Sequence, residues 1–96
     1  MPVIVTIEIP GGTQEQYDET TRLLMAAEWF PPAGLIAHAA GPDESGGWRV
    51  VDFWDSEDDF RAFMEKGRSI FDREGTRTVL PTVMEAVNVM VRPEPK

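Results

Sequence analysis

The sequence predicts one α+β domain whose elements follow the order strand–helix–strand–strand–helix–strand. Three observations support this fold class. The chain has 96 residues, the size of one small domain. Its first segment alternates in the way that a half-buried strand does. Two segments with helical spacing of apolar residues each begin with a capping pattern. Residues 1–96 are therefore expected to form this single domain, with residues 93–96 as a loose tail.

The first strand and helix occupy the N-terminal third of the chain. Residues 3–9 carry apolar side chains at every odd position, and a Pro-Gly-Gly turn ends the pattern. Thr13 then begins a helix, and Gln16 completes a capping box. This helix is expected to close at Phe30, because the prolines at 31 and 32 forbid its continuation.

The next two strands are expected to form an antiparallel hairpin. Residues 34–40 read as the second strand and residues 48–55 as the third, and the polar segment between them reads as a turn. Ser56 follows as a helix cap, with Asp59 at the capping-box position. The hairpin therefore leads directly into the second helix.

The second helix and the last strand complete the predicted order. Phe60 and Phe71 mark the ends of an apolar helical stripe, and Gly67 allows a bend within it. Gly75 is a stop signal for this helix. The last strand is expected to run from about Thr82 to Val91.

The composition excludes several classes of function. A net charge of −8, without a basic patch, disfavours nucleic acid. The absence of cysteine and the single histidine exclude cysteine-based metal sites and multi-histidine sites, so neither a metal nor a cofactor is expected. No segment approaches the ~20 apolar residues of a membrane helix, and the N-terminus lacks the pattern of a signal peptide. The expected location is the cytoplasm.

Several strands are apolar on both faces. Ile4 lies beside Val3 in the first strand, and Val50 lies beside Val51 in the third. Two helices cover only one face of a four-stranded sheet, so a second copy of the sheet is expected to cover the other. The sequence therefore predicts a homodimer.

A short stretch of the sequence resembles a known superfamily. Residues 52–57, Asp-Phe-Trp-Asp-Ser-Glu, followed by Phe60, resemble the acidic–x–Trp–acidic–Ser–x stretch of the dimeric α/β-barrel superfamily. The antibiotic-biosynthesis-monooxygenase-like domains are its nearest branch, and the fit covers the whole chain. The resemblance implies a ferredoxin-like βαββαβ fold, with a four-stranded antiparallel sheet and two helices on one face, assembled as a dimeric α/β barrel. Haem-degrading members of the superfamily carry a histidine late in the second helix, and residues 67–73 contain none.

His38 and Asp52 are the candidate catalytic residues. If the hairpin pairs Ala40 with Trp48, His38 and Asp52 become diagonal neighbours on one face. An aspartate that orients a histidine makes a reasonable general base. The alternative is a structural histidine at the dimer interface and an aspartate in an ion pair with an arginine.

Four further residues are candidate ligand contacts. Trp48 and Trp54 would form aromatic walls for a flat apolar ligand, and Tyr17 and Asn88 would place a hydroxyl and an amide within its reach. Each of the four also has a structural interpretation, as a residue of the core or of the dimer interface. Polyketide cyclases of the superfamily use a His–Tyr pair, which His38 and Tyr17 would imitate.

Together these features predict a cofactor-independent small-molecule enzyme of the monooxygenase, cyclase or isomerase type. Its substrate would be an aromatic or polyketide-like compound. The alternative is a homodimeric domain that binds an apolar ligand without transforming it, or that is purely structural. A cavity beside His38 would favour the enzyme or the ligand-binding domain. A filled interior would favour the purely structural domain.

Overall fold

A computed structural model of the protein describes residues 1–74 and 80–92. The predicted stop signal at Gly75 and the expected tail at residues 93–96 lie outside the described residues. The elements are β1 (Val3–Ile9), α1 (Gln14–Met25), β2 (Leu35–Pro42), β3 (Trp48–Trp54), α2 (Glu57–Lys66), α3 (Arg68–Glu74) and β4 (Thr82–Glu85).

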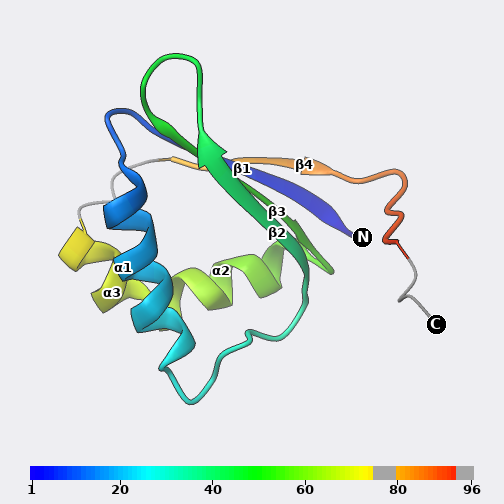
Figure 1. The fold of residues 1–96 in the computed structure, drawn as a ribbon. Coiled ribbons are helices and arrows are strands. Elements are labelled where there is room, and N and C mark those ends of the chain that lie inside the picture. Colours follow the sequence, from blue (N-terminus) through cyan, green and yellow to red (C-terminus); the bar gives the residue numbers. More distant parts are fainter. Residues whose placement is uncertain (75–79, 93–96) are drawn as a thin grey trace.

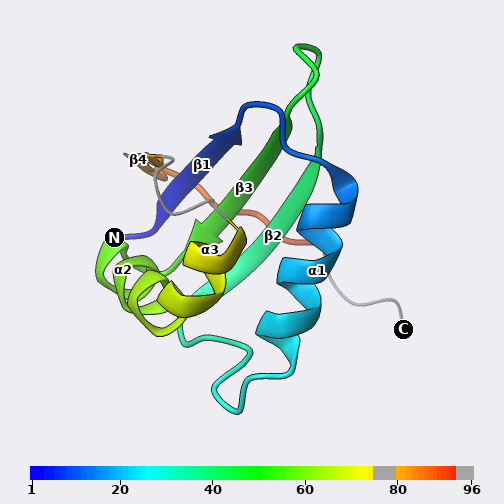
Figure 2. The same ribbon diagram turned by 90° about the vertical axis from the view of Figure 1, so that its left-hand side faces the viewer.

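The four strands form one antiparallel sheet in the order β2-β3-β1-β4. All the helices lie on one face of this sheet (Figure 1). Figure 2 shows α1 over the β2 side of the sheet and α2 over the side of β1 and β4. The predicted ferredoxin-like α+β fold is confirmed.

Helix α1 begins as predicted and ends earlier. The Gln16 N–H donates to Thr13 Oγ1 over 3.2 Å, and the Thr13 N–H donates to Gln16 Oε1 over 3.1 Å, which is a capping box. The helix ends at Met25, so its expected continuation to Phe30 was wrong. Beyond Met25 the N–H groups of Ala27 and Phe30 donate to carbonyls three residues back, so the chain reaches Pro31 through tighter turns than those of an α-helix.

The second helical segment divides at Gly67, where the sequence allows a bend. The Asp59 N–H donates to Ser56 Oγ over 3.1 Å, so Ser56 caps α2 as predicted. Helix α2 ends at Lys66, and α3 begins at Arg68.

Strand β4 is much shorter than predicted. It pairs with β1 from Thr82, opposite Thr6, to Glu85, opposite Val3. The Ala86 N–H donates to the Pro2 carbonyl over 2.9 Å, one residue beyond the end of each strand. The expected strand to Val91 was wrong: β4 ends at Glu85, opposite Val3 where β1 begins, and Pro2 has no N–H to extend the ladder.

The packed core lies beneath α2. Val3 and Val5 of β1, Trp54 of β3 and Phe60 of α2 are buried together. Helix α1, in contrast, buries none of its residues. In the described part of the chain, no helix is long and apolar enough to cross a membrane.

The opposite face of the sheet carries no helix and is apolar over much of its area. Ile4 of β1 and Phe53 of β3 are half-buried there, and Met84 of β4 is exposed. Apolar residues continue beyond β4, where Val87 is 100% exposed and Met90 is 84% exposed. This apolar surface has no cover within the described part of the chain.

Candidate functional site

The hairpin register places His38 directly opposite Asp52. Ala40 lies opposite Val50, so the expected pairing of Ala40 with Trp48 was wrong by two residues. Strand β2 runs on to Pro42, opposite Trp48, which shortens the loop. Because side chains alternate with a period of two, a slip of two residues leaves His38 and Asp52 on the same face.

A short loop holds this register. The Asp43 carboxylate accepts hydrogen bonds from the Ser45 N–H over 2.9 Å, from the Ser45 hydroxyl over 2.7 Å and from the Gly47 N–H over 3.0 Å. Gly46 has a φ of 90°, which few other residues adopt. These bonds, the Ser45 hydroxyl first, lower the pKa of Asp43 from its ordinary value.

A β-bulge changes which residues of β2 face the helices. Leu35 lies opposite Trp54 and Ala37 lies opposite Phe53, so Ile36 is the extra residue between them. Simple alternation along β2 would place Ile36 on the same face as His38. The bulge gives that place to Leu35, which lines the cavity described below.

A chain of hydrogen bonds runs through Asp52, His38 and Tyr17. His38 Nδ1 lies 2.5 Å from Asp52 Oδ1, and His38 Nε2 lies 2.5 Å from the Tyr17 hydroxyl oxygen. A carboxylate only accepts hydrogen bonds, so Nδ1 donates to Asp52; in a neutral imidazole Nε2 then accepts, and the Tyr17 hydroxyl donates to it. This direction fixes the tautomer of the imidazole.

Asp52, the buried end of this chain of hydrogen bonds, has a partner for each carboxylate oxygen. Asp52 is only 4% exposed, and its second oxygen, Oδ2, accepts a hydrogen bond from Trp54 Nε1 over 3.3 Å. Both carboxylate oxygens therefore have a donor, as a buried carboxylate requires. His38 lies at the boundary with solvent, with 37% of its side chain exposed.

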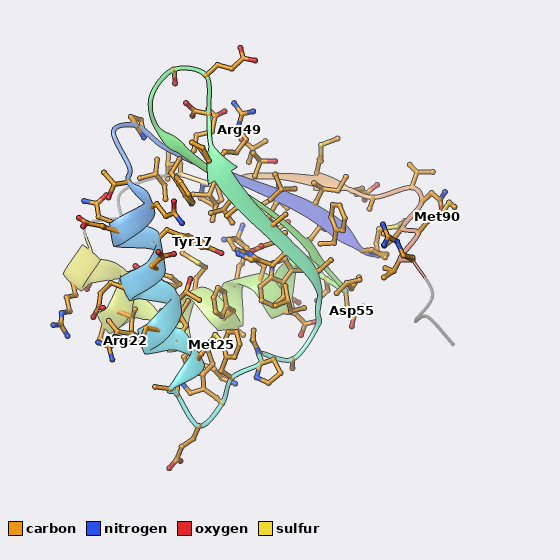
Figure 3. All side chains as sticks on the ribbon, viewed as in Figure 1. Tyr17, Arg22, Met25, Arg49, Asp55 and Met90 are labelled. Atoms are coloured by element: carbon orange, nitrogen blue, oxygen red, sulfur yellow. The ribbon has the colours of Figure 1, made fainter. Side chains whose placement is uncertain are left out.

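Tyr17, a residue of the helix layer, is the last member of this chain of hydrogen bonds. It lies on α1 and extends toward the space between the helices and the sheet (Figure 3). Its ring is nearly parallel to the imidazole of His38, at 3°, with centroids 5.9 Å apart. The ring of Trp48 lies on another side, with centroids 5.4 Å apart. One tyrosine therefore joins helix α1 to two residues of the sheet.

A cavity of about 290 Å³ lies between the sheet and the three helices. Its wall is mostly apolar, and its aromatic residues include Trp48, Trp54, Phe63 and Phe71. The hydrogen-bonded side chains of Asp52, His38 and Tyr17 form part of the same wall. The volume is close to the lower end of ligand sites, about 300–1,000 Å³, and suits a small fused-ring compound.

Five of the six predicted site residues meet at this cavity. They are Tyr17, His38, Trp48, Asp52 and Trp54. Asn88 does not: it lies beyond the end of β4, is exposed and is not part of the cavity wall. Its predicted place depended on a longer β4, which β1 cannot support.

The sequence analysis did not identify the polar residues of α1 that face the cavity. Gln16, Thr20 and Thr21 all contribute to the wall. A signal for them existed, because small polar residues recur at helical spacing on the face that should be apolar. Within the described residues, no group of three or more His, Asp or Glu side chains would hold a metal ion.

Comparison with known proteins locates this fold among solved structures. The sequence matches no family model and no curated protein. SnoaB, a cofactor-independent oxygenase from Streptomyces nogalater, matches in a mutant form with a TM-score of 0.65 and 11% identity over 95% of this chain and 97% of that one.

Two further structures are similar. Rv0793 from Mycobacterium tuberculosis has a TM-score of 0.66 and 15% identity over 95% of this chain and 100% of its own. A dimeric ferredoxin-like protein of unknown function from Thermobifida fusca has a TM-score of 0.61 and 18% identity over 90% of this chain and 92% of its own. The chain has the fold of these proteins. The resemblance found in the sequence is confirmed at the level of the fold.

Proposed function

We propose that the protein is a cofactor-independent enzyme that removes a proton from a small aromatic or polyketide-like compound. One observation carries this proposal. The hydrogen-bonded chain Asp52–His38–Tyr17 ends on the wall of an apolar cavity that would hold such a compound. A histidine, its orienting carboxylate and a hydroxyl are the components of a proton-transfer relay.

In this proposal Tyr17 is the residue that contacts the substrate. Both nitrogens of His38 are already engaged, one by Asp52 and the other by Tyr17. The substrate proton would therefore pass to the Tyr17 oxygen as the Tyr17 proton passes to His38 Nε2. The electron pair of the broken C–H bond moves onto the neighbouring carbonyl oxygen, and the Asp52 carboxylate stabilises the imidazolium that forms.

This step is common to the three reaction types that the sequence suggests. A carbanion next to a carbonyl can be reprotonated elsewhere by an isomerase, or can attack a second carbonyl in a cyclase. It can also react with dioxygen, which converts a CH₂ group into a carbonyl and releases one oxygen atom as water. SnoaB, which shares the fold, is a cofactor-independent oxygenase, and this supports the third possibility.

The proposal is tested with 2-tetralone, a flat ketone whose acidic C–H protons exchange for deuterium. We expect the protein in D₂O to accelerate this exchange above the buffer rate, measured by ¹H NMR. Tyr17→Phe and His38→Gln should each slow it at least about 100-fold, the usual contribution of acid–base catalysis. Asp18→Asn changes an exposed residue beside Tyr17 and should leave the rate unchanged.

Full exchange activity in Tyr17→Phe would contradict the proposed role of the tyrosine. The alternative, a protein that binds an apolar ligand without transforming it, predicts a different result. It predicts that 2-tetralone binds but exchanges no faster than in buffer. The scarcity of polar groups in the cavity wall is compatible with either outcome.

We further propose that two copies pack through the helix-free face of the sheet. The support is the apolar surface that includes Ile4, Phe53 and Met84, which no described part of this chain covers. Light scattering after size exclusion should give the mass of a dimer at micromolar concentration, and Phe53→Glu should give a monomer. A monomeric wild-type protein would contradict this arrangement.

A further inference from the structure

A second hollow, of about 260 Å³, adjoins the cavity. Its wall is formed by Phe60, Arg61 and Glu65 of α2, by Arg68 of α3, and by Leu80 and Pro81 before β4. Among the described residues, Met64 and Phe71 contribute to the walls of both this hollow and the cavity. The two spaces therefore approach each other at Met64 and Phe71.

Phe71 is the stiffer of these two shared residues, because methionine is unbranched and turns about three side-chain bonds. The Phe71 ring packs against the ring of Phe63, with centroids 5.6 Å apart and an inclination of 75°. Phe63 lines the cavity but does not line the second hollow. Two neighbouring rings of the same cavity wall thus differ in whether a second space borders them.

Gly67 allows the Phe71 ring to occupy this boundary. Gly67 is buried between α2 and α3, and the Phe71 N–H donates to its carbonyl over 3.0 Å. A side chain at position 67 would begin 2.7 Å from Cε2 of the Phe71 ring, which is closer than carbon atoms pack. The bend between the two helices therefore leaves room for the ring beside the cavity.

Phe71 and Tyr17 border different parts of the cavity. The rings that pack against Tyr17 are those of His38 and Trp48, whereas the ring of Phe71 packs against Phe63. Helix α3, which carries Phe71, lies beside both α1 and α2 (Figure 2). A ligand whose carbonyl lies at Tyr17 would therefore extend through the cavity until it meets the Phe71 ring.

We propose that Phe71 is the end wall of the ligand site and sets the length of the ligand that the cavity accepts. The inference rests on the proposed function only in its choice of a flat ketone held at Tyr17. Without the Phe71 ring, the cavity and the second hollow would form one elongated site, with the adaptable Met64 as the remaining shared residue. The ligand of the wild-type protein is thus a compact flat ketone without an extended side chain.

The test compares the binding of 2-tetralone with that of 6-pentyl-2-tetralone, whose side chain extends from the end of the rings opposite the carbonyl. Isothermal titration calorimetry gives the ratio of the two dissociation constants, in which the difference in hydration of the compounds cancels between variants. The wild-type protein should bind the pentyl compound no more tightly than 2-tetralone. Phe71→Ala should shift the ratio about tenfold toward the pentyl compound, the effect of burying about two further methylene groups.

Matched variants separate the end wall from a general enlargement of the cavity. Phe63→Ala removes the same ring from the wall at a place that does not border the second hollow, so it should shift the ratio less than about threefold. Phe71→Leu and Phe63→Leu repeat the comparison with a smaller loss of volume and keep it available if an alanine variant does not fold. Phe71→Leu should shift the ratio about threefold in the same direction, and Phe63→Leu should leave it unchanged.

Three results would overturn the inference. They are an unchanged ratio in the folded Phe71 variants, an equal shift in the Phe63 variants, and a wild-type protein that already favours the pentyl compound about tenfold. The outcomes also separate this inference from the proposed function. A ratio that depends on Phe71, without deuterium exchange, would support the end wall and refute the enzyme. Deuterium exchange with a ratio independent of Phe71 would support the enzyme and refute the end wall.

Discussion

Helices α1 and α2 cover the same face of the same sheet in different ways. Helix α2 places Phe60 in the buried core with Val5 and Trp54. Helix α1 turns Thr20 and Leu24 toward the sheet and buries none of its residues. Small and polar side chains cannot fill the space between a helix and a sheet. The cavity therefore exists because α1 presents side chains that do not fill the space between it and the sheet.

The largest difference is expected when each helix loses one apolar side chain. Phe60→Ala should lower the free energy of unfolding by about 3–5 kcal/mol, because it leaves a hole in a close-packed region. Leu24→Ala should cost about 1 kcal/mol or less, because that side chain already borders empty space. Urea unfolding of both variants at one protein concentration measures the two losses. Similar losses would show that α1 is packed as tightly as α2.

A smaller effect is expected from filling the cavity. Thr20→Leu adds apolar carbon to the wall and should raise the free energy of unfolding by about 0.5–1 kcal/mol. It should also weaken the binding of 2-tetralone, because the larger side chain occupies part of the cavity. Asp18→Leu, on the exposed side of the same helix, gains similar helix propensity but should not affect binding. Weakened binding in Asp18→Leu would mean that the ligand lies elsewhere.

The smallest effect concerns the hairpin loop, which lies outside the contrast between the helices. Hydrogen bonds from Ser45 and Gly47 lower the pKa of Asp43 in the folded state. A group with a lowered folded pKa adds stability above its ordinary pKa, and this stability is lost as the pH falls through the folded value. The difference in unfolding free energy between the wild type and Asp43→Ala should therefore shrink on acidification below about pH 4. A difference independent of pH would contradict this account of the loop.

Local patterns predicted most of the fold. The alternation in residues 3–9, the Thr13–Gln16 capping box and the Ser56 cap each depend on neighbouring residues, and the structure contains all three. The site was predicted in part for the same reason. His38 and Asp52 share a face in any register of the correct parity.

The remaining features depend on distant partners. The end of β4 is set by where β1 begins, and the hairpin register is set by the bonds of Asp43 across the loop. Neither appears in the periodicity of one strand. The same holds for the bond from Tyr17 to His38, which requires α1 to stand at a particular distance from the sheet. Only the assembled layers show that Nε2 of His38 is already bonded to a tyrosine on the cavity wall.

The central claim is that Asp52, His38 and Tyr17 form one directed chain of hydrogen bonds beside the cavity. Because His38 is the only histidine, ¹H–¹⁵N NMR of its side chain reports on this chain without ambiguity. With neutral imidazole, the account predicts the Nδ1–H tautomer, with its proton shifted far downfield by the Asp52 carboxylate and the shift lost in Asp52→Asn. An Nε2–H tautomer, or a rapidly exchanging mixture that Asp52→Asn does not alter, would contradict it.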